Sequence, residues 1–324
     1  MKETRDDTLA ELRRRATRAL RGMSHEALIE LSRRAITGPP PEQMSAEALA
    51  GLEALQNDVL PTEAQIAALE YAIRLFRPAP FVRDANIDPL PDETVKVFPE
   101  WADFAKKVSP FLRAIGRLDR VTPEGRPIAM GTGFLIAPTL LVTNRHVVWQ
   151  LSHGGDVVRP GEATVFFRCD WNTPPEPPVP VRRVADFHPE LDLAVLELEA
   201  VDRERTPLRL SAATPAVGQL VVAIGFPWDD GRNPAFVPLL FGDVFGVKRA
   251  APGEIVARRP SSFMHDCTTL GGNSGSPVLA MDTADVVGIH ADGLYLYRNE
   301  AISAVGGAPF LSSYAARPED GGLP

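Results

Sequence analysis

Short apolar runs, each bounded by Gly, Pro or Asn, recur along the chain from about residue 111 onward. Runs of this kind with turn residues between them are typical of strands in an all-β sandwich or barrel. The pattern covers about 200 residues, which is more than one small barrel needs. The clearest runs are F-L-I-A (134–137), L-L-V-T (140–143), A-T-V-F-F-R (163–168), L-A-V-L-E-L (193–198), L-V-V-A-I-G (220–225), S-P-V-L-A (276–280) and D-V-V-G-I-H (285–290).

Residues 1–77 follow a different, helical pattern. Apolar residues recur at helical spacing from Leu9 to Leu20, and Thr62 with Gln65 fits a capping box. These segments predict a small all-α domain, with Gly38 and three prolines separating two of its helices. The further helices are expected over 24–36, 45–59 and 62–76.

Residues 78–108 connect the two regions. Five prolines fall within 78–99 with little periodicity, and a short helix is expected from about Glu100 to Val108. The predicted domains are therefore a helical module (1–77), a Pro-rich linker with a short helix (78–108) and a β domain (109–324).

The composition excludes several classes of protein. A formal net charge of −8 argues against nucleic acid as the main partner, because neutralising phosphates needs a basic surface. No apolar run approaches a membrane span, and the charged start is unlike a signal peptide, so we expect no membrane contact and a cytoplasmic location. Cys169 and Cys267 provide neither a disulfide framework nor a metal pattern. We expect two reduced thiols, no metal and no cofactor.

The stretch T-L-G-G-N-S-G-S-P-V (269–278) places glycines, an asparagine and a proline around Ser274. One interpretation is a polar hairpin turn, because these are the usual turn residues. The other is a nucleophile whose neighbours lack side chains, so that backbone N–H groups can face a developing oxyanion. The stretch alone does not decide between them. A catalytic interpretation also needs a base and an orienting acid.

Two upstream residues are candidates for the base and the acid. His146, in L-L-V-T-N-R-H-V-V, directly follows an apolar strand, where a single histidine is more often structural. Asp192, in H-P-E-L-D-L-A-V-L, enters an apolar strand, where a carboxylate is costly unless it is paired or at the surface. Together with Ser274 they follow one of the three chain orders known for catalytic triads. The hydrolase motif G-x-S-x-G is not completed, because Ser276 replaces its last glycine.

From about residue 111 to 312 the chain resembles the chymotrypsin-like serine peptidases, especially bacterial trypsin-like members such as glutamyl endopeptidases and HtrA-type proteases. The blocks T-N-R-H-V-V, H-P-E-L-D-L-A-V-L and G-G-N-S-G-S-P-V carry the resemblance. It implies an all-β two-barrel chymotrypsin-like domain, here preceded by the small all-α domain and without room for a PDZ domain. It also implies an endopeptidase with a protein or peptide substrate. Ser274 would be the nucleophile, His146 the general base and then acid, and Asp192 the orienting carboxylate. The N–H groups of Gly272 and Ser274 would form the oxyanion hole.

Asn273 departs from the animal digestive enzymes of this family, which carry an aspartate that pairs with a newly cleaved N-terminus. A neutral asparagine cannot form that ion pair, so we expect activity without cleavage at the start of the domain. The rival interpretation is a catalytically silent, protease-like scaffold that binds peptides or partner proteins. Lost triad members are its usual mark, and the sequence retains all three.

The resemblance also suggests which side chain precedes the bond that is cut. Thr268 stands where a trypsin-type pocket has aspartate, so Lys and Arg are disfavoured. Thr269 and His290 match positions that glutamyl endopeptidases use to hold a substrate carboxylate, and both can donate a hydrogen bond to an anion. The strand expected to pair with the substrate backbone follows as Ala291, Asp292 and Gly293.

The helical module lies outside the resemblance. It fits a pro-segment, a docking module or a structural brace. Similar architectures in bacterial signalling and defence proteins use such a module for recruitment, and our hypothesis is that residues 1–77 bind a protein partner. The arginine run at 13–15 is more often the solvated side of a helix than a binding face.

Overall fold

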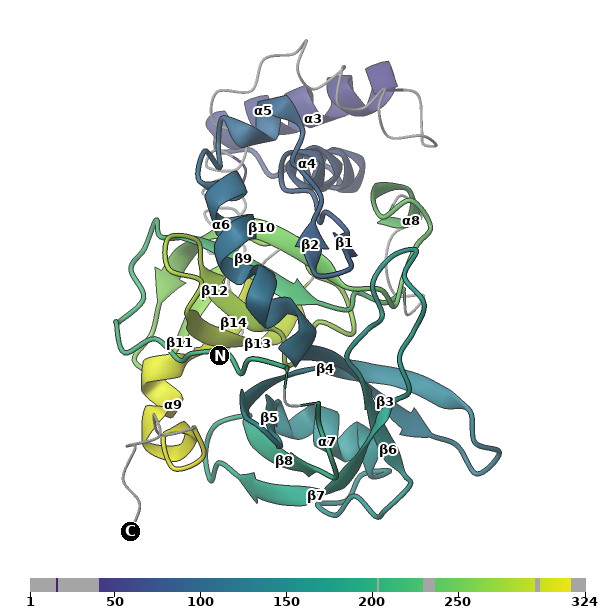
Figure 1. The fold of residues 1–324 in the computed structure, drawn as a ribbon. Helices are drawn as coiled ribbons and strands as arrows, with labels where there is room; N and C mark the ends of the chain where they lie inside the picture. Colours follow the sequence, from purple (N-terminus) through teal and green to yellow (C-terminus); the bar gives the residue numbers. More distant parts are fainter. Residues whose placement is uncertain (1–15, 17–40, 203, 230–236, 295–297, 316–324) are drawn as a thin grey trace.

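The computed structural model describes residue 16 and residues 41–202, 204–229, 237–294 and 298–315. Its main feature is a pair of closed antiparallel barrels of six strands each, with helices packed against one end (Figure 1). The expected fold class is therefore confirmed. The helices predicted near the start of the chain and over 24–36 lie outside the described residues.

The first barrel forms because each of its strands presents apolar side chains to a common centre. Phe134, Val142 and Val195 are fully buried there, and Val142 lies opposite Val195 on the neighbouring strand. The strands adjoin in the order β3-β4-β5-β8-β7-β6. They are β3 (Ile115–Val121), β4 (Pro127–Ala137), β5 (Leu140–Thr143), β6 (Ala163–Phe166), β7 (Val179–Phe187) and β8 (Ala194–Leu198).

The second barrel has the same construction, in the order β10-β11-β14-β13-β12-β9. Val221, Phe263 and Val278 belong to its buried apolar cluster. The strands are β9 (Leu220–Gly225), β10 (Arg249–Arg258), β11 (Ser262–His265), β12 (Pro277–Ala280), β13 (Val286–Leu294) and β14 (Arg298–Ser303). A helix, α9 (Ala304–Leu311), follows the last strand.

Lys248 ties the two barrels together just before β10. Its side chain is buried, and Nζ donates hydrogen bonds to the carbonyls of Leu112 at 2.7 Å and Phe167 at 2.9 Å. Asp170 lies 3.2 Å from the same nitrogen. Burial lowers the pKa of Lys248, and the Asp170 carboxylate opposes that shift. The ammonium group is thus fully engaged in holding the first barrel against the second.

The helical region before the barrels has its own small core. Helices α3 (Pro41–Gln56) and α4 (Glu63–Phe76) pack together through a buried apolar cluster that is separate from the barrel cores. The capping box is confirmed, since Gln65 N–H donates to Thr62 Oγ1 at 3.2 Å and Thr62 N–H donates to Gln65 Oε1 at 2.9 Å. A short helix, α8 (Val237–Leu240), lies beside α4 (Figure 1).

Residues 78–108 connect these helices to the barrels as a folded, packed segment. They contain the two-stranded β1 (Val82–Arg83) and β2 (Asn86–Ile87), the single turn α5 (Asp92–Val95) and α6 (Trp101–Val108), where the short helix was expected. The 3₁₀ helix η1 (Ser109–Ala114) leads into β3. Buried aromatic side chains of this segment belong to the large barrel core, notably Phe98 and Phe104.

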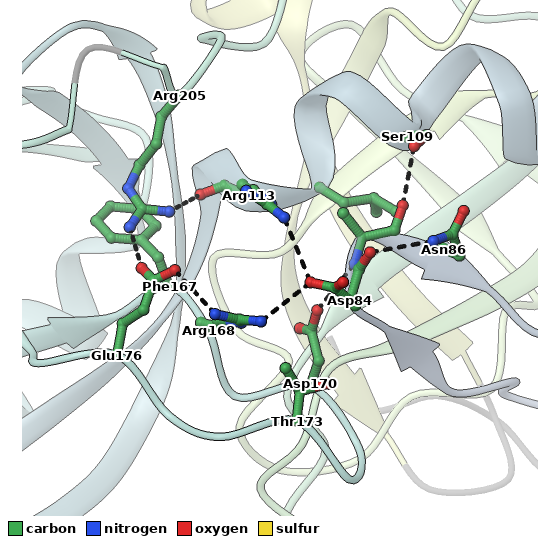
Figure 2. Close-up of polar contacts among 12 residues, drawn as sticks. Asp84, Asn86, Ser109, Arg113, Phe167, Arg168, Asp170, Thr173, Glu176 and Arg205 are labelled. Atoms are coloured by element: carbon green, nitrogen blue, oxygen red, sulfur yellow. Dashed lines mark hydrogen bonds and ion pairs between the residues drawn. The ribbon is translucent and has the colours of Figure 1, made fainter.

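The turn between β1 and β2 is bonded to the first barrel (Figure 2). Asp84 accepts hydrogen bonds from Arg113 at 3.3 Å and Arg168 at 3.2 Å. Nearby, Glu176 pairs with Arg205, whose guanidinium also donates to the Arg113 carbonyl at 2.9 Å. The connection is therefore held in place by polar contacts as well as by its apolar residues.

Candidate active site

His146 is positioned by the junction between β5 and helix α7 (Arg145–Leu151), where Asn144 is the N-cap residue. Its Nδ1 lies 2.6 Å from Asp192 Oδ2, and its backbone N–H donates to Asp192 Oδ1 at 2.9 Å. Asn144 Nδ2 donates to the Asp192 carbonyl at 2.9 Å. With the carboxylate ionised, Nδ1 carries the ring proton and Nε2 is left as an acceptor. The sequence predicted this pair, and the structure brings it together.

The loop that carries Asp192 is shaped by His188. The N–H groups of Glu190 and Leu191 donate to His188 Nδ1 at 3.1 and 2.9 Å, and His188 N–H donates to the Leu193 carbonyl at 3.0 Å. His188 thus closes the loop and presents the aspartate at its tip. The sequence analysis gave His188 no role, although it begins the H-P-E-L-D block.

Ser274 lies in the turn between β11 and β12, and so comes from the second barrel. Its hydroxyl is directed at the Ala291 carbonyl at 3.4 Å. Two glycines with positive φ flank it, Gly272 at 85° and Gly275 at 87°. Such backbone angles are strained for any residue with a Cβ, which explains the glycines around this serine.

The peptide between Gly271 and Gly272 has a defined orientation. The Gly271 carbonyl accepts a hydrogen bond from Trp228 N–H at 2.6 Å. Because the N–H and C=O of a trans peptide point in opposite directions, the Gly272 N–H is directed away from Trp228. A Cβ on Gly272 would lie 2.4 Å from the Phe226 carbonyl oxygen. The absence of a side chain at this position is therefore required by the protein's own packing.

Thr132, on β4, links the first barrel to the serine turn. Its N–H donates to the Ser274 carbonyl at 2.8 Å, and its Oγ1 donates to the Gly272 carbonyl at 2.7 Å. The same Oγ1 accepts from Phe226 N–H at 3.2 Å. The side chain is fully buried. The sequence analysis did not assign Thr132, and only its place in the G-T-G stretch before the first strong apolar run marks it.

A cleft of about 540 Å³ lies between the barrels, and most of the candidate catalytic residues line it. His146, Asp192 and Ser274 all line it, together with Gly272. Ala291 and Asp292 line it as well, where a substrate-pairing strand was expected. The cleft wall also includes Trp228, Met130 and Gln150, which the sequence analysis had not named.

The remaining predicted specificity residues, Thr268, Thr269, His290 and Gly293, do not line this cleft. Thr268 Oγ1 donates to the Arg77 carbonyl at 2.5 Å, and Thr269 Oγ1 donates to Asn299 Oδ1 at 2.9 Å. In the free protein both hydroxyls are therefore engaged within the chain. Gly293 pairs with Asn299 between β13 and β14. Sequence reasoning missed Asn299, because only the fold brings its side chain to this region, where Oδ1 accepts from Thr269 and Nδ2 donates to the Cys267 carbonyl at 2.6 Å.

His290 is buried and bonded to a second histidine. Its Nδ1 lies 3.1 Å from His265 Nε2. Burial, and to a lesser degree the nearby His146, lower the pKa of His290 to about 3. The ring is therefore neutral at neutral pH. If His265 donates in this pair, the proton of His290 resides on Nε2, where it can be donated to another group.

Comparison with known proteins assigns part of the chain to a protein family. Residues 131–289, which include His146, Asp192 and Ser274, match the family model of the trypsin-like peptidase domain. This part of the chain is a trypsin-like peptidase domain. A probable serine protease of Lysobacter enzymogenes is 28% identical, with 85% of this chain and 83% of that protein covered. That coverage is more than residues 109–324 alone can supply.

Solved structures are also similar to this chain. The serine endoprotease from Yersinia pestis aligns with a TM-score of 0.47 at 18% identity, with 65% of each chain covered. The Rv3671c protease of M. tuberculosis, in an inactive form, aligns with a TM-score of 0.44 at 19% identity, covering 65% of this chain and 93% of that one. This chain thus spans 65% of the length of the Yersinia protein.

Other features of the described residues bear on the sequence predictions. Among the described residues, none of the helices could cross a membrane, and His, Cys, Asp and Glu side chains form no cluster that could hold a metal ion. Cys169 and Cys267 are free thiols, and burial raises the pKa of each. The cytoplasmic location stays a prediction.

Proposed function

We propose that this protein is a serine endopeptidase that cuts protein or peptide bonds through an acyl-enzyme on Ser274. The observation that carries the proposal is the 2.6 Å contact between His146 and Asp192 in the same cleft as Ser274. An imidazole with an acceptor nitrogen, in one cleft with a hydroxyl, is the arrangement that nucleophilic catalysis needs. Each barrel supplies part of it.

In the first half of the reaction, Ser274 Oγ attacks the carbonyl carbon of the substrate while His146 Nε2 takes the hydroxyl proton. Asp192 stabilises the imidazolium that forms. The hydroxyl must first turn from the Ala291 carbonyl toward His146, a side-chain rotation that a contact of 3.4 Å hardly opposes. The C–N bond then breaks, and the leaving amine receives the proton from His146.

The negative charge on the substrate oxygen is stabilised by the backbone N–H groups of Gly272 and Ser274. The hydrogen bond from Trp228 to the Gly271 carbonyl supports this role, because it turns the next N–H away from Trp228. Removing one such donor typically costs about 3 kcal/mol of transition-state stabilisation. In the second half of the reaction, His146 takes a proton from water as the water oxygen attacks the acyl carbon. The bond between that carbon and Ser274 Oγ then breaks, and His146 returns the proton to Oγ.

The uncut chain is expected to be active. Asn273 is buried, and its side chain is engaged within the turn: Nδ2 donates to the Leu270 carbonyl at 3.3 Å and Oδ1 accepts from Ser276 Oγ at 3.4 Å. The turn therefore needs no new N-terminal ammonium group to form. If purified full-length protein were inert and became active only after trimming near Arg117, this expectation would be wrong.

We further propose a preference for Glu or Asp before the bond that is cut. It is supported by the His265–His290 contact, which allows His290 to present a donor on Nε2. Thr269 can contribute a second donor when its hydroxyl exchanges Asn299 for the substrate carboxylate. We expect peptides with Glu at this position to be cut faster than those with Leu or Arg. Faster cutting after Leu or Arg than after Glu would contradict the proposed preference. An unchanged Glu preference in His290→Ala would contradict the proposed role of His290.

The helical module is proposed to bind a protein partner as well. The apolar cluster of α3 and α4 supports this proposal, because a region with its own core can present a surface to a partner while α4 packs against the barrel domain with another face.

One experiment tests the peptidase activity and the preference together. Wild-type and Ser274→Ala proteins are incubated with a proteome-derived peptide library, and the cut sites are sequenced. Wild type should cut. Ser274→Ala and His146→Ala should each lose on the order of 10⁶-fold in kcat and Asp192→Ala on the order of 10⁴-fold, and combined variants should lose little more. Cutting by Ser274→Ala would contradict the mechanism. A folded wild type that cuts nothing would favour the silent scaffold.

A further inference from the structure

The segment from Asp266 to Gly272 joins strand β11 to the serine turn, and helix α4 holds one side of it. Helix α4 lies outside residues 131–289, the part of the chain that matches the peptidase family. The segment has no regular secondary structure apart from a single bridge at Gly271. Its position therefore depends on contacts from its neighbours.

Arg77, the C-cap residue of α4, provides two of these contacts. Its guanidinium Nη2 lies 2.9 Å from Asp266 Oδ2, and the two side chains are 3% and 2% exposed. Its backbone carbonyl accepts the hydrogen bond from Thr268 Oγ1 at 2.5 Å. The other oxygen of Asp266 accepts from Glu254 N–H at 2.7 Å, so the carboxylate fixes the segment to β10 as well.

A third contact comes from the apolar face of α4. Tyr71, Phe241 and Leu270 form one buried cluster. The Leu270 carbonyl accepts hydrogen bonds from Asn273 through its N–H at 3.2 Å and its Nδ2 at 3.3 Å. The cluster thus holds the residue whose carbonyl fixes the middle of the serine turn.

We propose that Arg77 is a positioning residue for the serine turn, whose Gly272 and Ser274 N–H groups face the oxyanion, and that the peptidase needs α4 for full activity. This inference rests on the proposed function. A buried ion pair that loses one partner leaves an uncompensated charge, so the segment must move to hydrate Asp266 once Arg77 is removed. Oxyanion donors act only when they are correctly placed, and a shift of about 1 Å costs as much as 100-fold in rate.

The test compares Arg77→Met with Arg205→Met in the full-length chain. Arg205 is a suitable control because it is also a well-buried arginine paired with a carboxylate, Glu176, but it lies in the network beside the first barrel (Figure 2). Kinetics are measured on a chromogenic peptide ester, together with the rate at which an organophosphonate labels Ser274. The thermal midpoint and circular dichroism report folding.

Arg77→Met is expected to lower kcat by about tenfold or more, with a smaller change in KM and with slower phosphonate labelling. Arg205→Met should lower the thermal midpoint yet keep kcat within about twofold of wild type. Arg77→Lys, which keeps the charge beside Asp266, should recover part of the lost kcat. A folded Arg77→Met with wild-type kcat would overturn the proposal, and so would an equal loss in Arg205→Met.

A second pair of variants decides the question if Arg77→Met does not fold. Tyr71→Ala removes the α4 side chain that clusters with Leu270, whereas Leu69→Ala removes one that packs toward α3. Tyr71→Ala should lower kcat and phosphonate labelling, and Leu69→Ala should change only stability. Equal kcat in both variants would overturn the proposal. Failure of the proposed function itself is recognised separately, because wild type would then neither cut the ester nor react with the phosphonate.

Discussion

Gly272 shows how tightly single residues are constrained at the active site. Its φ is +85°, and a Cβ would lie 2.4 Å from the Phe226 carbonyl, a distance that requires the backbone to move. The same residue is expected to donate its N–H to the oxyanion. Its conformation therefore serves the packing of the turn and the chemistry together.

We expect Gly272→Ala to lower kcat by about 10²- to 10³-fold, comparable to the loss of one oxyanion donor. The matched control is Gly125→Ala. Gly125 also has a positive φ, 78°, but no atom lies within 4 Å of its Cβ position. Steady-state kinetics on a peptide ester measure the effect. If the two variants lose the same activity, strain at positive φ rather than displacement of the turn is the cause.

Helix α4 is the element through which the helical region contacts the segment before the serine turn. It begins at a capping box and ends at Arg77, so its two ends have separate roles: Thr62 stabilises the helix, and Arg77 contacts the serine-turn segment. Cap residues act on helix stability, whereas the Arg77 contacts act on the geometry of the site. The two ends can therefore be separated by substitution.

Thr62→Ala should reduce the free energy of unfolding by about 1 kcal/mol, because it removes the side-chain acceptor for the Gln65 N–H. Chemical denaturation measures the change. Ser303→Ala is the control, since Ser303 is the N-cap of α9 but makes no side-chain cap hydrogen bond. Equal losses in the two variants would show that the capping box contributes nothing specific.

Apolar runs in the sequence reveal some of the barrel strands and miss others. All seven apolar runs lie in strands, because buried strands carry continuous apolar side chains. Five barrel strands were missed: β3, β7, β10, β11 and β14. Four of them have charged residues within them, and β7 also has residues exposed to solvent. The fifth, β11, is only four residues long. A strand that mixes buried and exposed residues, as β7 does, is hard to distinguish from a loop when its pairing partner is unknown.

At the scale of the whole molecule, the helical region contacts the peptidase domain along the segment that leads into the serine turn. Deletion of residues 1–40 leaves α4 and Arg77 in place, so we expect peptide cleavage close to wild type. Deletion of residues 1–77 removes both and should abolish most cleavage. Capture of a protein partner by the Ser274→Ala forms of each deletion tests recruitment separately. Full activity without residues 1–77 would mean that the module is a tether alone.

The sequence by itself indicated an all-β domain, the three catalytic candidates and the glycine-rich turn, and the two barrels were implied by its resemblance to the chymotrypsin-like peptidases. Strand patterning and the order His146, Asp192, Ser274 are local or nearly local in the chain, so they can be read without coordinates. Only the tertiary structure decided that Thr132 bridges the barrels to the serine turn and that Asn299 engages Thr269. It also decided that Arg77 contacts a segment nearly 200 residues later in the chain. Such contacts leave no periodicity in the sequence, because each joins single residues that folding alone brings together.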